Sequence, residues 1–289
     1  ATNQKVPNLD IKIDSLELND KKVGKLELVS NTLNQNINIQ KFKIVNDKNV
    51  FQADGEWIDW NKNSKSNINF SWKINNLGDT LNFLGYPNFV KDGEADLSGQ
   101  FRWPGNPLSF DKTKVDGSFN LDVRKGTIQK VEPGIGRLFG LVTLQSLPRR
   151  LSLDFRDLFG SGFVLDTMNA SVRVNNGIMK TSNFRMNGPA AEVFMTGETN
   201  IIHETQDLNV KVTPHISDSL SIAALAGGPL VGAAAFIAQK ILKDPLNKVL
   251  TSEYRIIGTW ENPEEVNNSA SDKIKTTIDN TKNLFNDKK

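Results

Sequence analysis

The chain has 289 residues, of which 38% are apolar and 24% are charged, so it can fold around a sizeable core as one large β domain or two ordinary domains. Lysine and arginine number 35 against 33 acidic residues, and this balance selects neither nucleic acid nor any other strongly charged partner. Cysteine is absent, which excludes disulfides, thiolate nucleophiles and cysteine-bound metals.

The N-terminus and the missing cysteines bear on location. An oxidising compartment such as a periplasm suits a chain without cysteine. The N-terminal segment 1–10 carries no basic stretch followed by an apolar one, so we expect no signal peptide in it. Because the chain begins without methionine and enters a strand pattern at once, we expect it to be a piece of a longer protein whose export signal is encoded upstream.

From Leu9 to Val123 apolar and polar side chains alternate, which is the period of a half-buried strand. The apolar residues stand at odd positions up to Ile13 and at even positions from Leu16, and this change of parity predicts a bulge or bend at Asp14–Ser15. Polar clusters separate the alternating stretches as turns. The clearest strands carry these apolar residues on one face: Ile68, Phe70, Trp72 and Ile74, then Leu97, Phe101 and Trp103, then Phe119, Leu121 and Val123.

The connections between these strands are short and contain no long helical period, apart from a short turn of helix around Asp79–Tyr86. Parallel pairing needs a crossover of about a dozen residues or more. We therefore expect a mainly β fold: a long, curled, largely antiparallel sheet with one apolar face, open as a groove.

The second half of the chain adds helical signals to further strands. Apolar residues at helical spacing predict one amphipathic helix over Glu132–Leu147, with Pro133 in its first turn. Alternation then returns, and the last strand is expected at Tyr254–Trp260. From Asn262 the sequence is polar and predicts a disordered tail or a weak helix. This divides the chain into an N-terminal β-meander over 1–130, a C-terminal region over 131–261 and a polar tail over 262–289.

One motif imitates a cofactor site. Gly134–Gly140 has the form G-x-G-x-x-x-G before a helix, with Asp154 about twenty residues on, as in a dinucleotide fingerprint. The preceding segment 126–131 is not a buried parallel strand, however, and no alternating βα units follow. A glycine-rich entry to a helix explains the motif better, and we expect no cofactor.

Residues for catalysis or metal binding are equally sparse. The charged cluster Arg149–Asp157 alternates with apolar residues, as a solvated or salt-bridged strand face does, although its carboxylates also allow acid/base chemistry. The only histidines, His203 and His215, have neither cysteine partners nor metal-ligand spacing, and no G-x-S-x-G occurs. We expect neither a metal site nor an enzyme.

An apolar run, Ser219–Leu242, is unlike the rest of the chain, and the roughly twenty residues between Asp218 and Lys240 carry no charge. It has three interpretations: a membrane-contacting element, a buried helix or hairpin that caps the apolar sheet face, or a single transmembrane span. Gly227–Pro229 should break it into two helical pieces, each too short to cross a bilayer. A C-terminal apolar helical hairpin is the resulting expectation.

Four motifs stand out in the second half of the chain: Val131–Leu141, Leu144–Phe159, Ala224–Ala234, and Tyr254–Trp260 with Asn262–Pro263. Together they resemble the C-terminal region of YhdP-type proteins of the AsmA superfamily, and the second motif is highly specific. The resemblance covers most of the chain after about Leu97, whereas the upstream part is similar only in its alternating strand pattern. The resemblance implies a periplasmic protein of Gram-negative bacteria, anchored in the inner membrane upstream of this chain, with a hydrophobic β-groove that carries phospholipid toward the outer membrane.

Together these patterns predict a non-enzymatic phospholipid conduit, of which this chain is the terminal section. Its partners would be phospholipid acyl chains and the inner leaflet of the outer membrane, with no nucleic acid. An alternative is a structural or interaction module of the cell envelope with a self-filled β core. The groove lining is expected at Ile68, Phe70, Trp72, Ile74, Leu97, Phe101, Trp103, Phe119, Leu121 and Val123, and membrane docking at Leu220, Leu225, Pro229, Leu230, Phe236 and Ile237.

Overall fold

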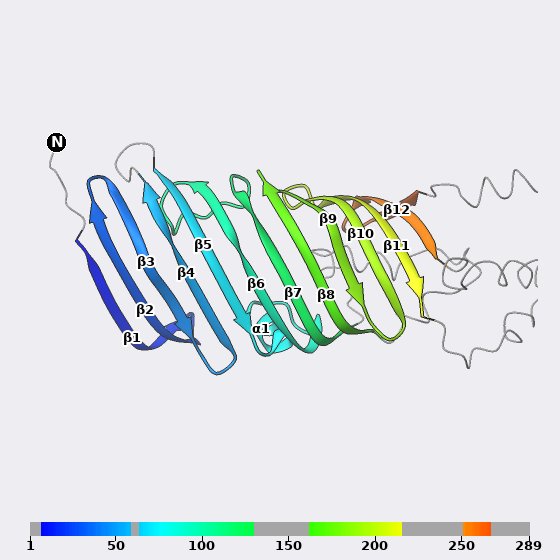
Figure 1. The fold of residues 1–289 in the computed structure, drawn as a ribbon, viewed down its shortest axis with the longest axis horizontal. Helices are drawn as coiled ribbons and strands as arrows, with labels where there is room; N and C mark the ends of the chain where they lie inside the picture. Colours follow the sequence, from blue (N-terminus) through cyan, green and yellow to red (C-terminus); the bar gives the residue numbers. More distant parts are fainter. Residues whose placement is uncertain (1–6, 59–63, 130–161, 216–250, 267–289) are drawn as a thin grey trace, which may run out of the picture.

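The chain forms one long open sheet in the computed structural model, which describes residues 7–58, 64–129, 162–215 and 251–266. In these ranges the sheet has thirteen strands, which pair in sequence order and are all antiparallel (Figure 1). Thirteen strands about 4.8 Å apart make a sheet on the order of 60 Å across. The prediction of a mainly β fold with one long, open antiparallel sheet is confirmed.

The strands are long enough to carry several side chains on each face. Their bounds are β1 Leu9–Leu18, β2 Lys21–Leu33, β3 Asn36–Val45, β4 Asn49–Ile58, β5 Lys65–Ile74, β6 Val90–Pro104, β7 Asp116–Ile128, β8 Phe163–Asn175, β9 Ile178–Asn187, β10 Ala191–Asn200, β11 Thr205–Pro214, β12 Ser252–Thr259 and β13 Pro263–Val266.

Irregularities in the ladder occur where the apolar parity of the sequence changes. In β1 the register shifts between Ile13 and Leu16, as the sequence predicts. In β3 it shifts between Ile39 and Phe42, so that Ile37 and Phe42 reach the same face although their parities differ. Each extra residue is absorbed as a bulge, which keeps the apolar side chains together.

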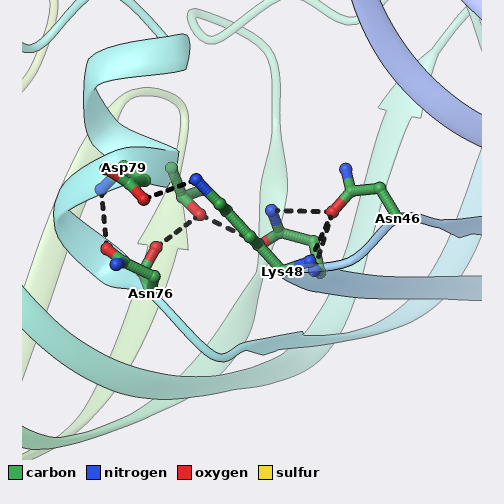
Figure 2. A network of polar contacts seen from close by, with 6 residues as sticks. Asn46, Lys48, Asn76 and Asp79 are labelled. Atoms are coloured by element: carbon green, nitrogen blue, oxygen red, sulfur yellow. Dashed lines mark hydrogen bonds and ion pairs between the residues drawn. The ribbon is translucent and has the colours of Figure 1, made fainter.

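The short helix α1, Leu77–Phe83, connects β5 to β6. It begins two residues before the predicted turn, because the Asn76 side chain accepts a hydrogen bond from the Asp79 backbone N–H at 2.8 Å and caps the first turn. Lys48 in the β3–β4 turn reaches Asp79 at 2.6 Å, and Figure 2 shows both contacts. Leu77 and Leu81 pack against the buried cluster of the sheet, so α1 covers part of the apolar face.

The buried cluster extends over the strands from β5 to β12. Its members include Ile74, Ala95, Val123, Leu165, Met168, Met186, Val193, Met195, Val210 and Ile256. Burial is nearly complete at the C-terminal end, where Val193 and Val212 are 0% exposed and Ile256 is 1% exposed. The core of the described residues therefore lies on one face of the sheet.

The C-terminal edge differs from the sequence-based expectation. Pro263–Val266, the start of the segment assigned to the polar tail, forms β13 and pairs with β12. Backbone pairing with β12 makes this strand, and its proline stands at the first position, where a missing N–H is tolerated. The predicted helix over 132–147 and the predicted hairpin over 219–242 lie outside the described residues.

Glycines allow β6 and β7 to approach closely beside large aromatic rings. A Cβ at Gly117 would lie 2.0 Å from the Gln100 carbonyl oxygen, and one at Gly99 would lie 2.3 Å from that of Ser118. Gly117 pairs with Phe101, and Gly99 pairs with Phe119. Each phenylalanine thus stands beside a position that has no side chain, which gives its ring room on the apolar face.

Replacing Gly117 should destabilise the sheet, because a side chain there collides with the backbone of β6. We expect Gly117→Val to lower the free energy of unfolding by about 3 kcal/mol, measured by urea denaturation. Gly85→Val is the control, because Gly85 also has a positive φ of +93° but would meet nothing within 4 Å. Equal losses for the two variants would contradict the close-approach explanation.

Candidate functional site

The register places the predicted groove residues on one face of the sheet. Ile68 pairs with Phe101, and Trp72 pairs with Leu97, which in turn pairs with Leu121. Ile74 and Val123 both pair with Ala95. Phe70 and Phe119 both pair with Gly99, and Trp103 lies two positions beyond Phe101 on β6. Since side chains alternate between the faces of a strand, all of these residues share a face.

Aromatic rings form a continuous strip across β3–β7 on this face. Phe42 contacts Phe51 with ring centroids 6.1 Å apart, and Phe51 stacks on Phe70 at 6.5 Å. Phe70 stacks on Phe101 at 5.2 Å, and Phe101 contacts Phe119 edge-on at 6.2 Å. Such contacts fix ring positions and contribute about 0.5–1.5 kcal/mol each beyond area burial. The strip gives five neighbouring strands one connected apolar surface.

Further aromatic residues join the strip. Trp72 contacts Phe51 edge-on, with ring centroids 6.0 Å apart. Phe110 comes from the β6–β7 connection, and its ring centroid lies 5.4 Å from that of Trp103 and 6.3 Å from that of Phe101. Sequence reasoning left Phe42, Phe51 and Phe110 out of the groove list. Alternation around Phe42 and Phe51 could have identified those two, whereas Phe110 lies in a connection without periodicity.

Exposure changes along the apolar face. Among the predicted groove residues Ile74, Trp103 and Val123 are buried, at 5%, 8% and 2% exposure. The others are half-buried: Ile68, Phe70, Trp72, Leu97, Phe101, Phe119 and Leu121. Most apolar side chains of this face are therefore partly accessible over β3–β7. From β8 to β12 its most buried side chains are not accessible to solvent. The accessible part is the candidate binding surface.

The opposite face is polar and carries ion pairs between neighbouring strands. Described pairs include Lys41–Glu27, Arg124–Asp96, Lys180–Glu198, Arg185–Glu192, Lys211–Glu253 and Arg255–Asp207. Hydrogen bonding to Asp96 is the main cause of the raised pKa of Arg124. Exposed pairs of this kind stabilise a fold only slightly. Their main effect is to make the two faces of the sheet chemically different.

A hollow of about 990 Å³ lies beside polar-face residues of β7–β12. Its lining is already hydrogen-bonded internally: the Ser171 hydroxyl donates to Asn120 at 2.8 Å, and the Asn183 amide donates to the Ser171 hydroxyl at 3.2 Å. Arg255 completes the lining with Asp207. The lining also includes Phe119, Val172 and Ile178, but most of its residues are polar.

The residues that suggested chemistry do not form a catalytic site in the described part of the chain. His203 lies in the β10–β11 turn, and His215 follows the other end of β11. Within the described ranges no group of His, Cys, Asp or Glu side chains is placed to hold a metal ion. Gly134–Gly140, Arg149–Asp157 and Asp154 lie outside the described residues, so the structure does not bear on them.

The predicted docking element also falls outside the described ranges. Its residues are Leu220, Leu225, Pro229, Leu230, Phe236 and Ile237. Among the described residues no helix is both long enough and apolar enough to span a bilayer.

Comparison with known proteins defines the family. A family model described as YhdP protein matches residues 1–265. This chain belongs to the YhdP family. The match begins at the first residue, so it includes the part upstream of about Leu97, where the sequence motifs gave a similarity only in general pattern. No solved structure matches the chain significantly.

A curated relative supports the same assignment. "Intermembrane phospholipid transporter YhdP" of Escherichia coli strain K12 is 28% identical over 214 residues, which cover 73% of this chain. The chain spans only 17% of that relative's length. The likeness therefore covers most of this chain but only a small part of the named transporter.

The ion pair between β11 and β12 gives a pH-dependent prediction. Arg255 donates from Nε to Asp207 Oδ1 at 2.7 Å and from Nη2 to Oδ2 at 2.6 Å, and this bonding lowers the pKa of Asp207. Because the folded-state pKa lies below the unfolded value of about 3.9, the pair stabilises the fold above that pH and less as the pH falls through the folded-state pKa.

Asp207→Asn should therefore cause a small loss of stability at pH 7 that disappears in acid. Urea midpoints of the variant and of the unchanged chain, measured between pH 7 and pH 3, check this. Asp166→Asn on β8 is the control, because no ion pair is found for Asp166 among the described residues. A loss that stays constant over this pH range would contradict the assignment.

Proposed function

We propose that this chain is a section of a non-enzymatic conduit that carries phospholipids between the inner and outer membranes. The supporting observation is the partly accessible aromatic strip on one face of an open sheet, backed by a polar face. Acyl chains need only apolar contact, at about 0.8 kcal/mol per buried CH₂ group. Transport of this kind uses no catalytic residue and no cofactor.

The family supports the class of cargo. The E. coli relative is named as an intermembrane phospholipid transporter, and this chain is similar to a small part of it. We propose that the acyl chains lie against Phe70, Phe101 and Phe119, across the strands. A large apolar face is a liability in water unless it binds something, and a lipid that moves along it satisfies this requirement.

The proposed location is the periplasm of a Gram-negative bacterium, with the membrane anchor upstream of this chain. The similarity of the specific motifs to the C-terminal region of YhdP-type proteins supports a terminal position in the conduit. The apolar run over 219–242 is then the proposed docking element at the inner leaflet of the outer membrane. That assignment rests on its sequence alone.

A second candidate function is a structural or interaction module with a self-filled core. The near-complete burial of Val193, Val212 and Ile256 favours it for β10–β12. It does not explain the half-buried aromatic strip over β3–β7. The two candidates therefore make opposite predictions for that strip.

The conduit predicts that a charge on the strip expels lipid without unfolding the chain. Phe101→Asp should reduce co-purifying phospholipid several-fold, measured by mass spectrometry of gently purified protein, because a carboxylate is costly to hold against acyl chains. Gln100→Asp is the matched control, since Gln100 is the neighbouring residue on the polar face of β6 and is exposed. Circular dichroism establishes that both variants fold.

The outcomes separate the candidates. Lipid retained by Gln100→Asp and lost from folded Phe101→Asp supports the conduit. Absence of phospholipid from the unchanged chain, together with unfolding of Phe101→Asp, favours the self-filled module. Equal lipid content in both variants would overturn the assignment of the strip.

A further inference from the structure

A pocket of about 760 Å³ lies between α1 and the turns at the ends of β1–β4. Its volume falls within the range of about 300–1,000 Å³ that is typical of small-molecule sites. Ile44, Phe51 and Trp72 line it, and the latter two belong to the apolar strip. The pocket therefore adjoins the proposed acyl-chain surface at the edge of the sheet.

Helix α1 forms one wall of the pocket and is tied to the neighbouring turns by polar contacts. Lys48 pairs with Asp79 at 2.6 Å, and the Thr80 hydroxyl lies 3.1 Å from Asn49 Oδ1 (Figure 2 shows the Lys48–Asp79 contact). At the other end, Lys21 Nζ donates to the Phe83 carbonyl oxygen at 2.7 Å. These contacts fix the wall without filling the space beneath it.

Apolar side chains remain exposed at the rim. Phe83 and Leu84, at the C-terminal end of α1, line the pocket and are 40% and 48% exposed. Leu18, in the nearby β1–β2 hairpin, is 56% exposed. An opening with apolar edges suits a ligand that enters partly from an apolar phase.

Charged residues line the pocket in equal numbers of each sign. They are Lys22, Lys25 and Lys48 on the positive side and Asp14, Asp47 and Asp79 on the negative side. Only Lys48 and Asp79 are paired with each other; for the other charged lining residues no ion pair is found in the described part of the chain. Lys25 lies two positions from Glu27 on β2, so its side chain is on the polar face. The Lys22 ammonium and the Asp14 and Asp47 carboxylates are thus left to interact with a ligand.

We propose that this pocket, named the α1 pocket, holds the headgroup of a zwitterionic phospholipid whose acyl chains lie on the aromatic strip. The Lys22 ammonium would bind the phosphate, and the Asp14 and Asp47 carboxylates would bind the headgroup ammonium. Charge-assisted hydrogen bonds of both kinds are strong, and each charge of the headgroup finds an opposite charge. The inference rests on the proposed function, because it assumes that the strip binds acyl chains.

The balance of charge distinguishes this ligand from an anionic lipid. A phosphate without a cationic partner would gain from Lys22 but would also meet Asp14 and Asp47, which line the same pocket. A zwitterion uses both sets of groups. The α1 pocket should therefore discriminate by headgroup, whereas the aromatic strip should not.

The test compares lipids that share their acyl chains. The chain is incubated with vesicles that contain equal amounts of dioleoyl phosphatidylethanolamine, dioleoyl phosphatidylglycerol and dioleoylglycerol, then re-isolated, and bound lipid is quantified by mass spectrometry. We expect a several-fold preference for phosphatidylethanolamine over both other lipids. Equal binding of all three lipids would overturn the headgroup site and leave the conduit standing. Binding of none would contradict the conduit itself.

Charge variants test the residues. Lys22→Glu should lower bound phosphatidylethanolamine several-fold and leave dioleoylglycerol unchanged. Lys43→Glu is the matched control, because it makes the same change of charge on the polar face of β3, beside Glu27. If both variants lower phosphatidylethanolamine equally, the effect is one of net charge and the proposal is wrong.

A second variant removes negative charge from the α1 pocket and should change lipid binding in the opposite direction. Its result does not depend on whether the lysine variant folds. Asp14→Asn with Asp47→Asn leaves the lysines in excess, so bound phosphatidylglycerol should rise relative to phosphatidylethanolamine. An unchanged ratio in a folded variant, as judged by circular dichroism, would show that these carboxylates do not contact the headgroup and would overturn the proposal.

Discussion

The register of one antiparallel ladder is the constraint on which the rest of this structure depends. Every described strand pairs with its neighbours in sequence, so the described residues form one continuous sheet without a crossover between its strands. A slip of one residue would move a whole strand's apolar side chains to the polar face. Bulges such as those in β1 and β3 absorb extra residues where the sequence parity changes, and glycines beside Phe101 and Phe119 make room for the rings.

A sheet that keeps its apolar side chains on one face creates a surface rather than a closed core. Over β3–β7 that surface is an aromatic strip that stays half-buried, and toward β12 it becomes fully buried. α1 covers part of the apolar face, and the α1 pocket, which is lined by charged residues of both signs, lies beside it. The accessible strip suits acyl chains and the pocket suits a headgroup, so the two features together match the two halves of a phospholipid.

Local rules predict much of this fold from sequence. Alternation gives the strands and the face on which Ile68 and Phe101 lie, and the parity change at Asp14–Ser15 locates a bulge. Other features depend on contacts that have no periodic signal: Phe110 joins the strip from a loop, β13 forms because β12 offers a free edge, and α1 begins early because Asn76 caps it. The α1 pocket combines turns far apart in the chain, so only the fold brings its residues together.

The most direct measurement of the central claim is photocrosslinking along β5. A photoreactive side chain is placed in turn at residues 68 to 73, and attached phospholipid is identified by mass spectrometry. If acyl chains lie on the apolar face, crosslinks should alternate, with lipid attached from the positions of Ile68, Phe70 and Trp72 and not from those of Asn69, Ser71 and Lys73. Crosslinks without this two-residue period, or none from the apolar positions, would contradict the account.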